Sequence, residues 1–275
     1  MAARVVLVGG GKMGGALLAG WLGKGGIAAG EVVVVEPAAD AARALGRHGV
    51  TVIDSPAALD GGRAPAVVVF AVKPQVIAGV VADYRRPAGA KGPAPVYLSI
   101  AAGTRLALFE QRLGAQAAVV RAMPNTPAAV GRGITVAVAN ARVGAEQIAL
   151  CTELLEAVGE VAWIGDEALM DAVTGLSGSG PAYVFLMIEC LAAAGVAVGL
   201  APDLAARLAR ATVTGAGELA WRSEDSAETL RRNVTSPGGT TAAALDVLMA
   251  ADGLEALMTR AVAAATERSR ELASG

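Results

Sequence analysis

Two clusters of residues have the types and spacing needed for chemistry, one near each end of the chain. Near the carboxyl end, residues 235–241 read TSPGGTT and directly precede an Ala-rich run that predicts a helix. The first N–H groups of a helix have no backbone partners, and the helix dipole adds partial positive charge there. Hydroxyl side chains and paired glycines at such a position predict a compact site for a small carboxylate, without any Lys or Arg.

Near the amino end, the sequence GGGKMG lies between a short apolar run and an Ala/Leu-rich run. This strand–glycine–helix context is what the dinucleotide-binding fingerprint requires. Gly9 permits the tight turn, Gly11 lets a pyrophosphate approach the backbone, and Gly14 lets the helix pack closely on the strand. We therefore expect a nicotinamide or flavin dinucleotide here, with an ordinary Gly-rich turn as the alternative. The expected cofactor residues of this motif are Gly9, Gly11, Lys12, Met13 and Gly14.

Glu36 ends the second expected strand, 22 positions after Gly14 (36 − 14 = 22). An acidic residue at about this spacing usually accepts hydrogen bonds from the adenosine ribose hydroxyls, which favours NADH over NADPH. A solvated helix-capping role beside Pro37 is the alternative. Arg43 leaves binding of a 2′-phosphate open.

Three further strand ends are expected at the same crevice, because ligands of open α/β sheets lie beyond the carboxyl ends of the strands. Small residues and prolines there suit a flat nicotinamide ring, although Pro-Asn-Thr-Pro is also compatible with a rigid turn. These segments are Ala71-Val72-Lys73-Pro74, Ser99-Ile100-Ala101-Ala102-Gly103 and Met123-Pro124-Asn125-Thr126-Pro127.

These sites need a scaffold, and the first 164 residues alternate short β-rich runs with helical ones. The strands read as unbroken apolar runs, as expected when both faces of a sheet are covered. We expect an α/β fold in which a Rossmann-type, doubly wound parallel sheet forms a dinucleotide-binding domain over residues 1–165. The expected strands are 4–8, 31–35, 50–53, 66–72, 96–100, 118–123, 134–139 and 161–164, and the expected helices are 13–22, 38–47, 75–84, 105–112 and 145–158.

Beyond Asp166 the β pattern disappears, which predicts an all-α domain for dimerisation and substrate binding over residues 166–275, after a linker at 165–167. Its helices carry more Ala and Gly than a domain of this size buries alone, which favours packing against a partner chain. The expected helices are 168–176, 182–198, 202–220, 226–233, 241–250 and 253–272.

Composition excludes several classes of function. The chain has 275 residues and a net charge of −2, so it offers no basic face for nucleic acid. No lysine follows Lys91, and His48, the single histidine, is expected in a surface loop. No metal site of His and Cys is therefore expected. Cys151 and Cys190 lie far apart, which indicates no disulfide framework and a reducing, cytoplasmic compartment.

No membrane attachment is expected. The apolar run from Ala182 to Leu200 is interrupted by Glu189 and two glycines. It favours a buried helix, with a possible place at a subunit interface, over a membrane span. The amino end passes straight into the first strand, which leaves no room for a signal peptide.

Six motifs along the whole chain resemble those of pyrroline-5-carboxylate reductase, the enzyme that makes proline. The resemblance implies a Rossmann domain followed by a helical dimerisation domain, intertwined dimers and possible decamers, and NADPH or NADH as cofactor. The motifs are GGGKMG, AVKPQ, SIAAG, RAMPNTP, GLSGSGPAY and NVTSPGGTTAAAL, which begin at residues 9, 71, 99, 121, 175 and 233.

The resemblance also implies roles for individual residues. Thr241 would lie near the ring nitrogen of the substrate as the catalytic hydroxyl, and backbone amides of the TSPGGTT segment would hold the carboxylate. Many relatives carry a small or basic residue at the position of Glu36, so the choice of cofactor stays open. The implied substrate-binding residues are Ser236, Gly238, Gly239, Thr240, Thr241 and Glu224, and the implied nicotinamide contacts are Ala71, Lys73, Pro74, Asn125 and Thr126, with Val72 between them.

Two alternatives compete with the reductase. A β-hydroxyacid dehydrogenase also pairs a Rossmann domain with helices, but its chemistry uses a lysine in the helical domain, and this chain has none there. A non-catalytic nucleotide sensor would not need the substrate corner at residues 236–241. The reductase is the prediction, with hydride delivered to the C=N carbon of Δ1-pyrroline-5-carboxylate.

Overall fold

The computed structural model describes residues 4–23, 26–59, 64–87 and 92–274, which fall into two compact units. The first unit reaches Gly178 and takes in the chain again from Thr266, and the second consists of Ser179–Ala265. The break lies downstream of the linker expected at 165–167, because Met170 and Asp171 are still buried in the first unit. The expectation of no leader segment rests partly on Met1 to Ala3, which lie outside the described residues.

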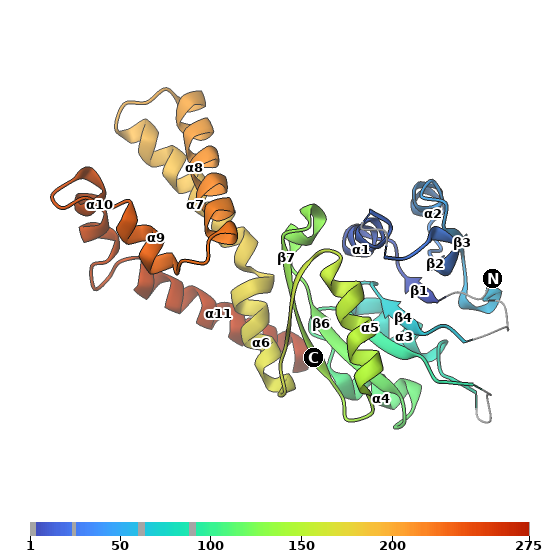
Figure 1. Ribbon diagram of the computed structural model, residues 1–275. Helices are drawn as coiled ribbons and strands as arrows, with labels where there is room; N and C mark the ends of the chain where they lie inside the picture. Colours follow the sequence, from blue (N-terminus) through green and yellow to red (C-terminus); the bar gives the residue numbers. More distant parts are fainter. Residues whose placement is uncertain (1–3, 24–25, 60–63, 88–91, 275) are drawn as a thin grey trace. The chain divides into compact units, whose positions relative to one another are not determined.

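One eight-stranded sheet organises the first unit, in the order β3-β2-β1-β4-β5-β6-β7-β8 (Figure 1). Its central strands are rich in Val and almost fully buried, as a chain with 3% aromatic residues requires. This confirms the expected doubly wound α/β architecture, with strand ends within a few residues of the expected ones. The strands are β1 Val5–Val8, β2 Val32–Val35, β3 Thr51–Ile53, β4 Val67–Phe70, β5 Val96–Ser99, β6 Ala118–Met123, β7 Gly133–Ala139 and β8 Gly159–Trp163.

The expectation of an all-parallel sheet is wrong at one pair of strands. β1 to β6 pair in parallel, but β7 runs antiparallel to β6, with Met123 opposite Val136. The connection between them is a short 3-10 helix, η3 (Thr126–Val130). A parallel crossover needs a dozen or more residues, usually with a helix, so the chain turns back instead. β8 then pairs in parallel with β7.

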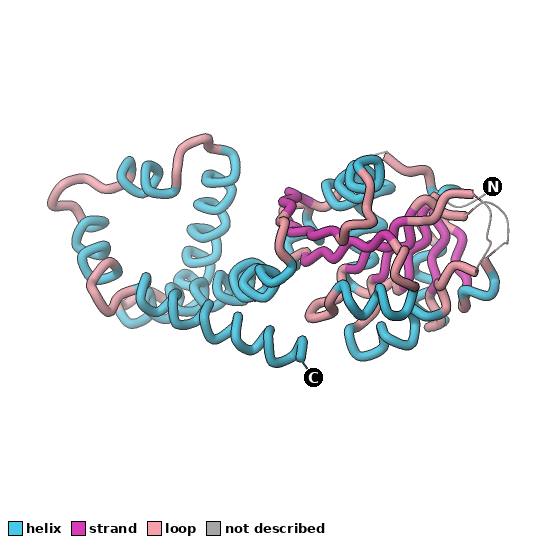
Figure 2. The backbone as a smooth tube through the Cα atoms, turned by 90° about the horizontal axis from the view of Figure 1, so that it is seen from below, coloured by secondary structure: helices cyan, strands magenta, loops and turns pink. Residues whose placement is uncertain are grey.

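Helices cover both faces of the sheet (Figure 2). Successive strand residues alternate between two hydrophobic clusters, as the pleat dictates. Val5 and Leu7 pack with side chains of α1 and α5, whereas Val6 and Val8 share the other cluster with side chains of α3 and α4. The helices of this unit are α1 Lys12–Gly23, α2 Ala39–Gly46, α3 Pro74–Ala82, α4 Leu106–Leu113, α5 Ala145–Glu156 and α6 Met170–Val173, with 3-10 helices η1 Ala29–Glu31, η2 Pro56–Ala58, η3 and η4 Glu167–Leu169, and a π-helical turn, η5 Thr174–Gly178.

Helices make up the second unit, as expected from the loss of β pattern. α7 and α8 pack side by side, and a Cβ added at Gly195 of α7 would lie 3.1 Å from the Cβ of Ala205 on α8. Close contact between these two helices therefore depends on small residues. The helices are α7 Gly180–Ala197, α8 Pro202–Arg222, α9 Ala227–Asn233, α10 Thr240–Leu248 and α11 Leu254–Ser274, the last of which ends in the first unit.

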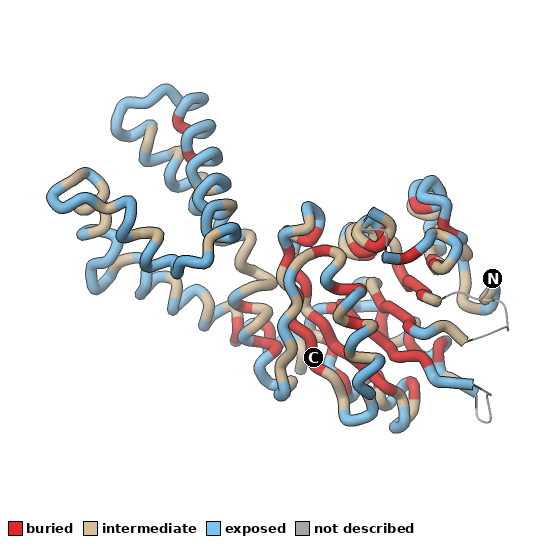
Figure 3. The backbone as a smooth tube through the Cα atoms, in the orientation of Figure 1, coloured by how far each residue is buried: buried red, intermediate tan, exposed pale blue. Residues whose placement is uncertain are grey.

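Burial differs sharply between the two units (Figure 3). Of the described residues 179–265, only Ala205 and Ala209 are buried. The expectation that the apolar helix near Ala182–Leu200 is buried is therefore wrong within a single chain: α7 buries none of its residues. By length and composition alone, the described helical stretch Glu167–Ala197 is long and apolar enough to cross a membrane. Core helices of soluble proteins meet the same criterion, so this is weak support for a span.

Candidate functional site

The glycine-rich turn lies where the strand order of the sheet reverses, between β1 and β4 (Figure 1). In open α/β sheets this switch point is where ligands bind, beyond the carboxyl ends of the strands. Gly9 follows β1, and Lys12 begins α1. The N-terminus of α1 therefore lies at the crevice, where its free N–H groups favour an anion.

The three glycines of the fingerprint, Gly9, Gly11 and Gly14, suit their positions for different geometric reasons. Gly9 has a φ of +94°, which L side chains rarely adopt. A Cβ at Gly14 would lie 2.3 Å from the carbonyl oxygen of Gly9, so only glycine lets α1 approach the turn. Gly11 has nothing within 4 Å of its added Cβ and faces open space. This arrangement fits a pyrophosphate that approaches the backbone at Gly11.

Gly10, which the fingerprint leaves unspecified, is also constrained. A Cβ there would meet the side chain of Leu45 on α2 at 2.1 Å. Its backbone N–H donates to Glu36 Oε2 over 2.8 Å. Sequence reasoning missed Gly10, because the partners that constrain it lie far along the chain.

Glu36 is half-buried directly after β2, and its carboxylate is held at both oxygens. Oε1 accepts a hydrogen bond from the backbone N–H of Ala38 over 3.0 Å, in addition to the bond between Oε2 and Gly10. The Ala38 bond corresponds to the helix-capping alternative, since Ala38 is the N-cap of α2. The Gly10 bond also brings Glu36 to the glycine-rich turn, where the ribose-binding hypothesis requires it.

The end of β4 lies against the same turn. The backbone N–H of Ala71 donates to the carbonyl of Val8 over 2.8 Å, and an added Cβ at Gly14 would lie 3.1 Å from the Cβ of Ala71. Val72 Cγ1 would lie 2.8 Å from a Cβ at Gly9. The structure thus brings the Gly-rich turn together with Ala71 and Val72. Lys73 and Pro74 follow as the exposed N-cap and first residue of α3.

The neighbouring strand end, after β5, is tightly packed. Ser99 is fully buried, and its Oγ accepts a hydrogen bond from the N–H of Ala101. Gly103 turns the chain with a φ of +71°. The carboxyl end of β5 therefore presents mainly backbone and small side chains, as its composition predicts.

Asn125, expected among the nicotinamide contacts, uses its side chain within the protein. Its Oδ1 accepts a hydrogen bond from the N–H of Ile134 over 3.0 Å, and its Nδ2 lies 3.4 Å from Ser177 Oγ. The first bond braces the turn between β6 and β7, and the second joins it to the π-helical turn η5. Thr126, at the start of η3, is exposed. The side chain of Asn125 thus has a structural task that its sequence motif did not reveal.

The predicted substrate residues lie in the second unit, at the start of α10. The N–H of Gly239 donates to the carbonyl of Ser236 over 3.0 Å, and Gly238 has a φ of +68°. With Pro237 between them, these are the features of a type II turn. Gly239 is the N-cap of α10, so the expected helix entrance is confirmed. Thr240 is exposed and Thr241 half-buried at this entrance.

Two other residues singled out from the sequence lie outside these groups. Glu224 is exposed in the connection between α8 and α9. His48 is exposed in the turn that follows α2, as expected.

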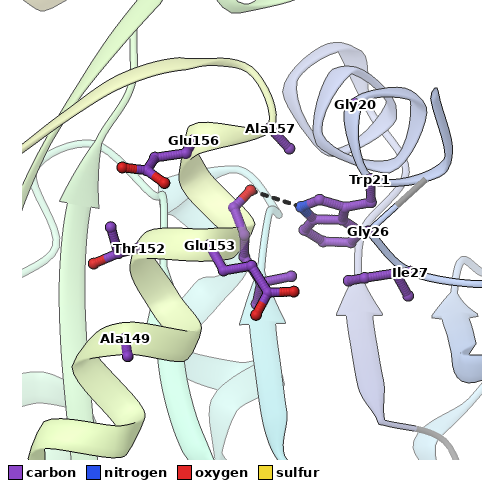
Figure 4. Close-up of a pocket in the computed structure, with 10 residues that line it drawn as sticks. Gly20, Trp21, Gly26, Ile27, Ala149, Thr152, Glu153, Glu156 and Ala157 are labelled. Carbon is purple, nitrogen blue, oxygen red and sulfur yellow. Dashed lines mark hydrogen bonds between the residues drawn. The ribbon is translucent and has the colours of Figure 1, made fainter. Parts of the chain in front are cut away.

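A separate hollow of about 540 Å³ lies between α1 and α5 (Figure 4). Trp21 closes it from one side, with its indole N–H donating to the carbonyl of Leu154 over 2.8 Å. Thr152, Glu153 and Glu156 lie on α5 beside it. Because Gly20 and Trp21 belong to the carboxyl-terminal half of α1, the hollow lies away from the glycine-rich turn at the start of that helix. We assign it no part in cofactor binding.

Two family models match the chain in succession. The model described as "NADP oxidoreductase coenzyme F420-dependent" matches residues 4–103, and the model described as "pyrroline-5-carboxylate reductase dimerisation" matches residues 167–272. The second match covers the exposed apolar helices of the second unit.

Curated relatives match over nearly the whole chain. Pyrroline-5-carboxylate reductase of Pseudomonas aeruginosa is 41% identical over 271 residues, which cover 98% of this chain and 97% of the relative. The enzyme of the same name from Synechocystis sp. is also 41% identical, over 99% of both chains.

Solved structures agree with these relatives. A pyrroline-5-carboxylate reductase from Coxiella burnetii superposes with a TM-score of 0.91 at 34% identity, over 99% of both chains. A pyrroline carboxylate reductase from Plasmodium falciparum, solved with NADP bound, superposes with a TM-score of 0.79 at 28% identity over 98% of both chains. The likeness to an imine reductase from Streptomyces aurantiacus, at 18% identity, shows the fold alone.

Proposed function

Because this chain belongs to the pyrroline-5-carboxylate reductase family, we propose that the residues described above carry out the NAD(P)H-dependent reduction of Δ1-pyrroline-5-carboxylate to L-proline. The observation that carries this assignment is identity of 41% over 98% of the chain to a curated reductase. When bound, the cofactor supplies the hydride that is added to the C=N carbon of the substrate.

The glycine-rich turn is proposed to hold the cofactor. Gly11 leaves the backbone open to the pyrophosphate, and the N–H groups at Lys12 and Met13 belong to the first turn of α1, where an anion is stabilised. Glu36 is proposed to accept hydrogen bonds from the adenosine ribose. Ala71, Val72, Lys73 and Pro74, at the end of β4, and Asn125 and Thr126, after β6, are proposed to border the nicotinamide.

The turn before α10 is proposed to bind the substrate carboxylate. The N–H of Gly239 is used within the turn, but the N–H groups of the first α10 residues have no partner inside the helix. These amides, with the hydroxyls of Ser236 and Thr240, form an anion site that uses no cationic side chain. Gly238 is needed because the turn requires its positive φ. Glu224 is proposed to lie near the substrate.

Thr241 is proposed as the catalytic residue, with its hydroxyl at the ring nitrogen. A cyclic imine is protonated readily in water, so the protein needs to orient the substrate more than to supply a strong acid. This is consistent with a chain whose single histidine is exposed in a turn of the first unit. The Thr241 hydroxyl would orient the nitrogen and stabilise its changing charge.

The helical part of the chain, residues 166–275, is proposed to act as the dimerisation and substrate-binding domain, after a dinucleotide-binding domain over 1–165. Its match to a dimerisation family and its exposed apolar helices support a homo-oligomer. The dimer is proposed as the basic unit, with a decamer as a possible larger assembly. Cytoplasmic location is proposed from the two free cysteines and from the family.

Oxidation of NADH or NADPH, followed by absorbance with pyrroline-5-carboxylate as substrate, tests the assignment. Turnover is expected with this substrate, and its absence despite tight cofactor binding would favour a nucleotide sensor. Turnover only with a β-hydroxyacid would favour the dehydrogenase alternative.

Thr241→Ala tests the catalytic role. It should lower kcat by about 10²-fold, as loss of one oriented polar group does, while the Kd for NAD(P)H changes little. Thr241→Ser keeps the hydroxyl and should restore most of the rate. Equal loss of rate and of cofactor binding in Thr241→Ala, or no loss of either, would contradict the role.

A further inference from the structure

The carboxylate of Glu36 has a fixed position at the adenosine end of the crevice. The backbone on both sides of it is tied down, because the N–H of Gly9 donates to the carbonyl of Val35 and the N–H of Glu36 donates to the carbonyl of Ile53, each over 2.9 Å. The carboxylate itself receives the N–H groups of Gly10 at 2.8 Å and Ala38 at 3.0 Å. Both main-chain and side-chain bonds thus hold this negative charge beside the glycine-rich turn.

The hydrogen-bonding capacity left on this carboxylate matches a diol. An ionised carboxylate is acceptor-only and has about four lone-pair sites on its two oxygens. One N–H occupies each oxygen of Glu36, so each oxygen keeps room for another donor. The 2′- and 3′-hydroxyls of an adenosine ribose are two adjacent donors, which this arrangement can accept.

A 2′-phosphate would be repelled by the carboxylate at the same place. A phosphate monoester carries a charge of about −1.5 to −2 near neutral pH and offers mainly acceptor oxygens. Facing Glu36, it would meet a like charge, and the N–H groups of Gly10 and Ala38 are already bonded to that carboxylate. The carboxylate cannot rotate away without giving up its bonds to Gly10 and Ala38.

The nearest cation along the chain already has an acidic partner. Arg43 on α2 is the nearest basic residue along the chain, and its guanidinium pairs with the carboxylate of Asp40, one turn earlier on the same helix. The side chains of both residues are largely exposed, at 73% and 94%. Glu36, Asp40 and Arg43 together carry one net negative charge. The guanidinium of Arg43 is therefore not reserved for a phosphate.

We propose that Glu36 makes this reductase prefer NADH to NADPH, because its fixed carboxylate accepts the ribose hydroxyls and repels a 2′-phosphate. The proposal rests on the proposed function, since it concerns the adenosine end of the same cofactor site. It assigns to Glu36 a role in specificity that leaves the hydride-transfer chemistry unchanged.

Titration calorimetry of the full-length protein with NADH and with NADPH, without substrate, tests this preference. The wild type should bind NADH at least about tenfold more tightly, given the size of a charge–charge interaction at a partly buried site. Glu36→Ser removes the charge and opens space, so it should weaken NADH binding and strengthen NADPH binding. The ratio of the Kd for NADPH to the Kd for NADH should fall about tenfold or more. Glu36→Gln keeps the shape and should shift the ratio in the same direction.

Glu146→Gln is the matched control, since it removes an exposed negative charge from the first turn of α5, near Arg4 and Ala66 at the starts of the strands and away from Gly10. The ratio of its two Kd values should stay within about threefold of the wild-type ratio, as expected for an exposed charge screened by solvent. Thermal unfolding and circular dichroism identify any variant that fails to fold. If Glu36→Ser does so, Glu36→Gln supplies the measurement.

The outcomes separate this proposal from the reductase assignment. Equal or tighter binding of NADPH by the wild type, or an unchanged ratio in folded Glu36 variants, overturns the preference while turnover with pyrroline-5-carboxylate still supports the reductase. Binding of neither nucleotide would overturn both.

Discussion

Arg121 and Glu167 form an ion pair inside the first unit, with 2.8 Å between Arg121 Nη1 and Glu167 Oε1. The Arg121 side chain, in the middle of β6, is only 5% exposed, and the Glu167 side chain, at the start of η4, is 27% exposed. The same Glu167 oxygen accepts the N–H of Leu106 at the start of α4 over 2.8 Å. One carboxylate thus joins three elements near the strand end that carries Asn125.

Removing one partner of this pair should destabilise the protein strongly. Glu167→Ala leaves the guanidinium of Arg121 buried without its counter-charge, and it should lower the free energy of unfolding by about 3 kcal/mol. Urea unfolding of the wild type and the variant measures this difference. Arg121→Met combined with Glu167→Leu removes both charges and should recover most of the loss.

The exposed pair of Arg4 and Glu153, at 3.3 Å, is the control for this prediction. Its side chains are 36% and 48% exposed, so Glu153→Ala should change the free energy of unfolding by less than about 1 kcal/mol. Similar losses in Glu167→Ala and Glu153→Ala would show that burial of Arg121 does not determine the effect.

Gly11→Ala should separate cofactor binding from folding. Its added Cβ meets nothing within 4 Å, so the free energy of unfolding should stay within about 0.5 kcal/mol of the wild type. The same Cβ would enter the space proposed for the pyrophosphate, so the Kd for NADH should rise about tenfold or more. Calorimetry and urea unfolding give the two quantities.

Gly23→Ala is its matched control, because Gly23 also faces open space but lies at the other end of α1. The affinity for NADH should be unchanged in this variant. An unchanged Kd in Gly11→Ala as well would place the pyrophosphate away from the turn.

Phe185→Glu should disrupt the homo-oligomer. Phe185 is 59% exposed on α7 in the single chain, within the stretch that matches the dimerisation family. A charge on a surface that becomes buried between subunits is strongly unfavourable. Light scattering coupled to size-exclusion chromatography should show smaller species than for the wild type.

Val76→Glu provides the comparison, since Val76 is 52% exposed on α3, outside the matched dimerisation stretch. It should leave the molar mass unchanged. A wild-type mass for Phe185→Glu would exclude α7 from the subunit interface.

Cys151 should make the protein less stable in alkali. Burial raises the pKa of this thiol from an ordinary value of 9.0 to about 12. The folded state therefore keeps the proton that the unfolded state loses, and the stabilisation is complete below about pH 9 and disappears as the pH rises towards 12. At about pH 10.5 the loss should be about 2 kcal/mol relative to neutral pH.

Urea unfolding at several pH values checks this dependence. Cys151→Ala should flatten the alkaline loss, although it lowers stability at every pH by removing a buried side chain. Cys190→Ala, at the exposed cysteine, should keep the wild-type slope. The same slope in Cys151→Ala and the wild type would assign the alkaline loss to other groups.

Local patterns were sufficient to predict most of the fold. Short, unbroken apolar runs rich in Val predicted strands such as β1 and β4, and helix and strand ends lay within a few residues of expectation. The turn at Gly9 and the entrance of α10 after Gly239 were also predicted, because a positive φ or a helix N-cap depends on a few adjacent residues. The roles proposed for these residues in binding remain predictions.

Features that join distant parts of the chain were not predictable in this way. The antiparallel pairing of β7 is different, because the short connection through η3 that requires it is already visible in the sequence. The bonds of Asn125 to Ile134 and Ser177, and the return of α11 through the bond between Ser269 and Asp171, join residues that sequence periodicity does not relate.

Glu36 shows both kinds of feature, the local ones that the sequence predicts and the distant contacts that it does not. The sequence alone determined that an acidic residue ends β2 near a dinucleotide fingerprint, because strand periodicity and glycine spacing are local properties. Only the tertiary structure decided that its carboxylate accepts a hydrogen bond from the N–H of Gly10, 26 positions away. The physical reason is that a side chain acquires its hydrogen-bond partners only when the packing of strands and helices brings distant backbone groups together.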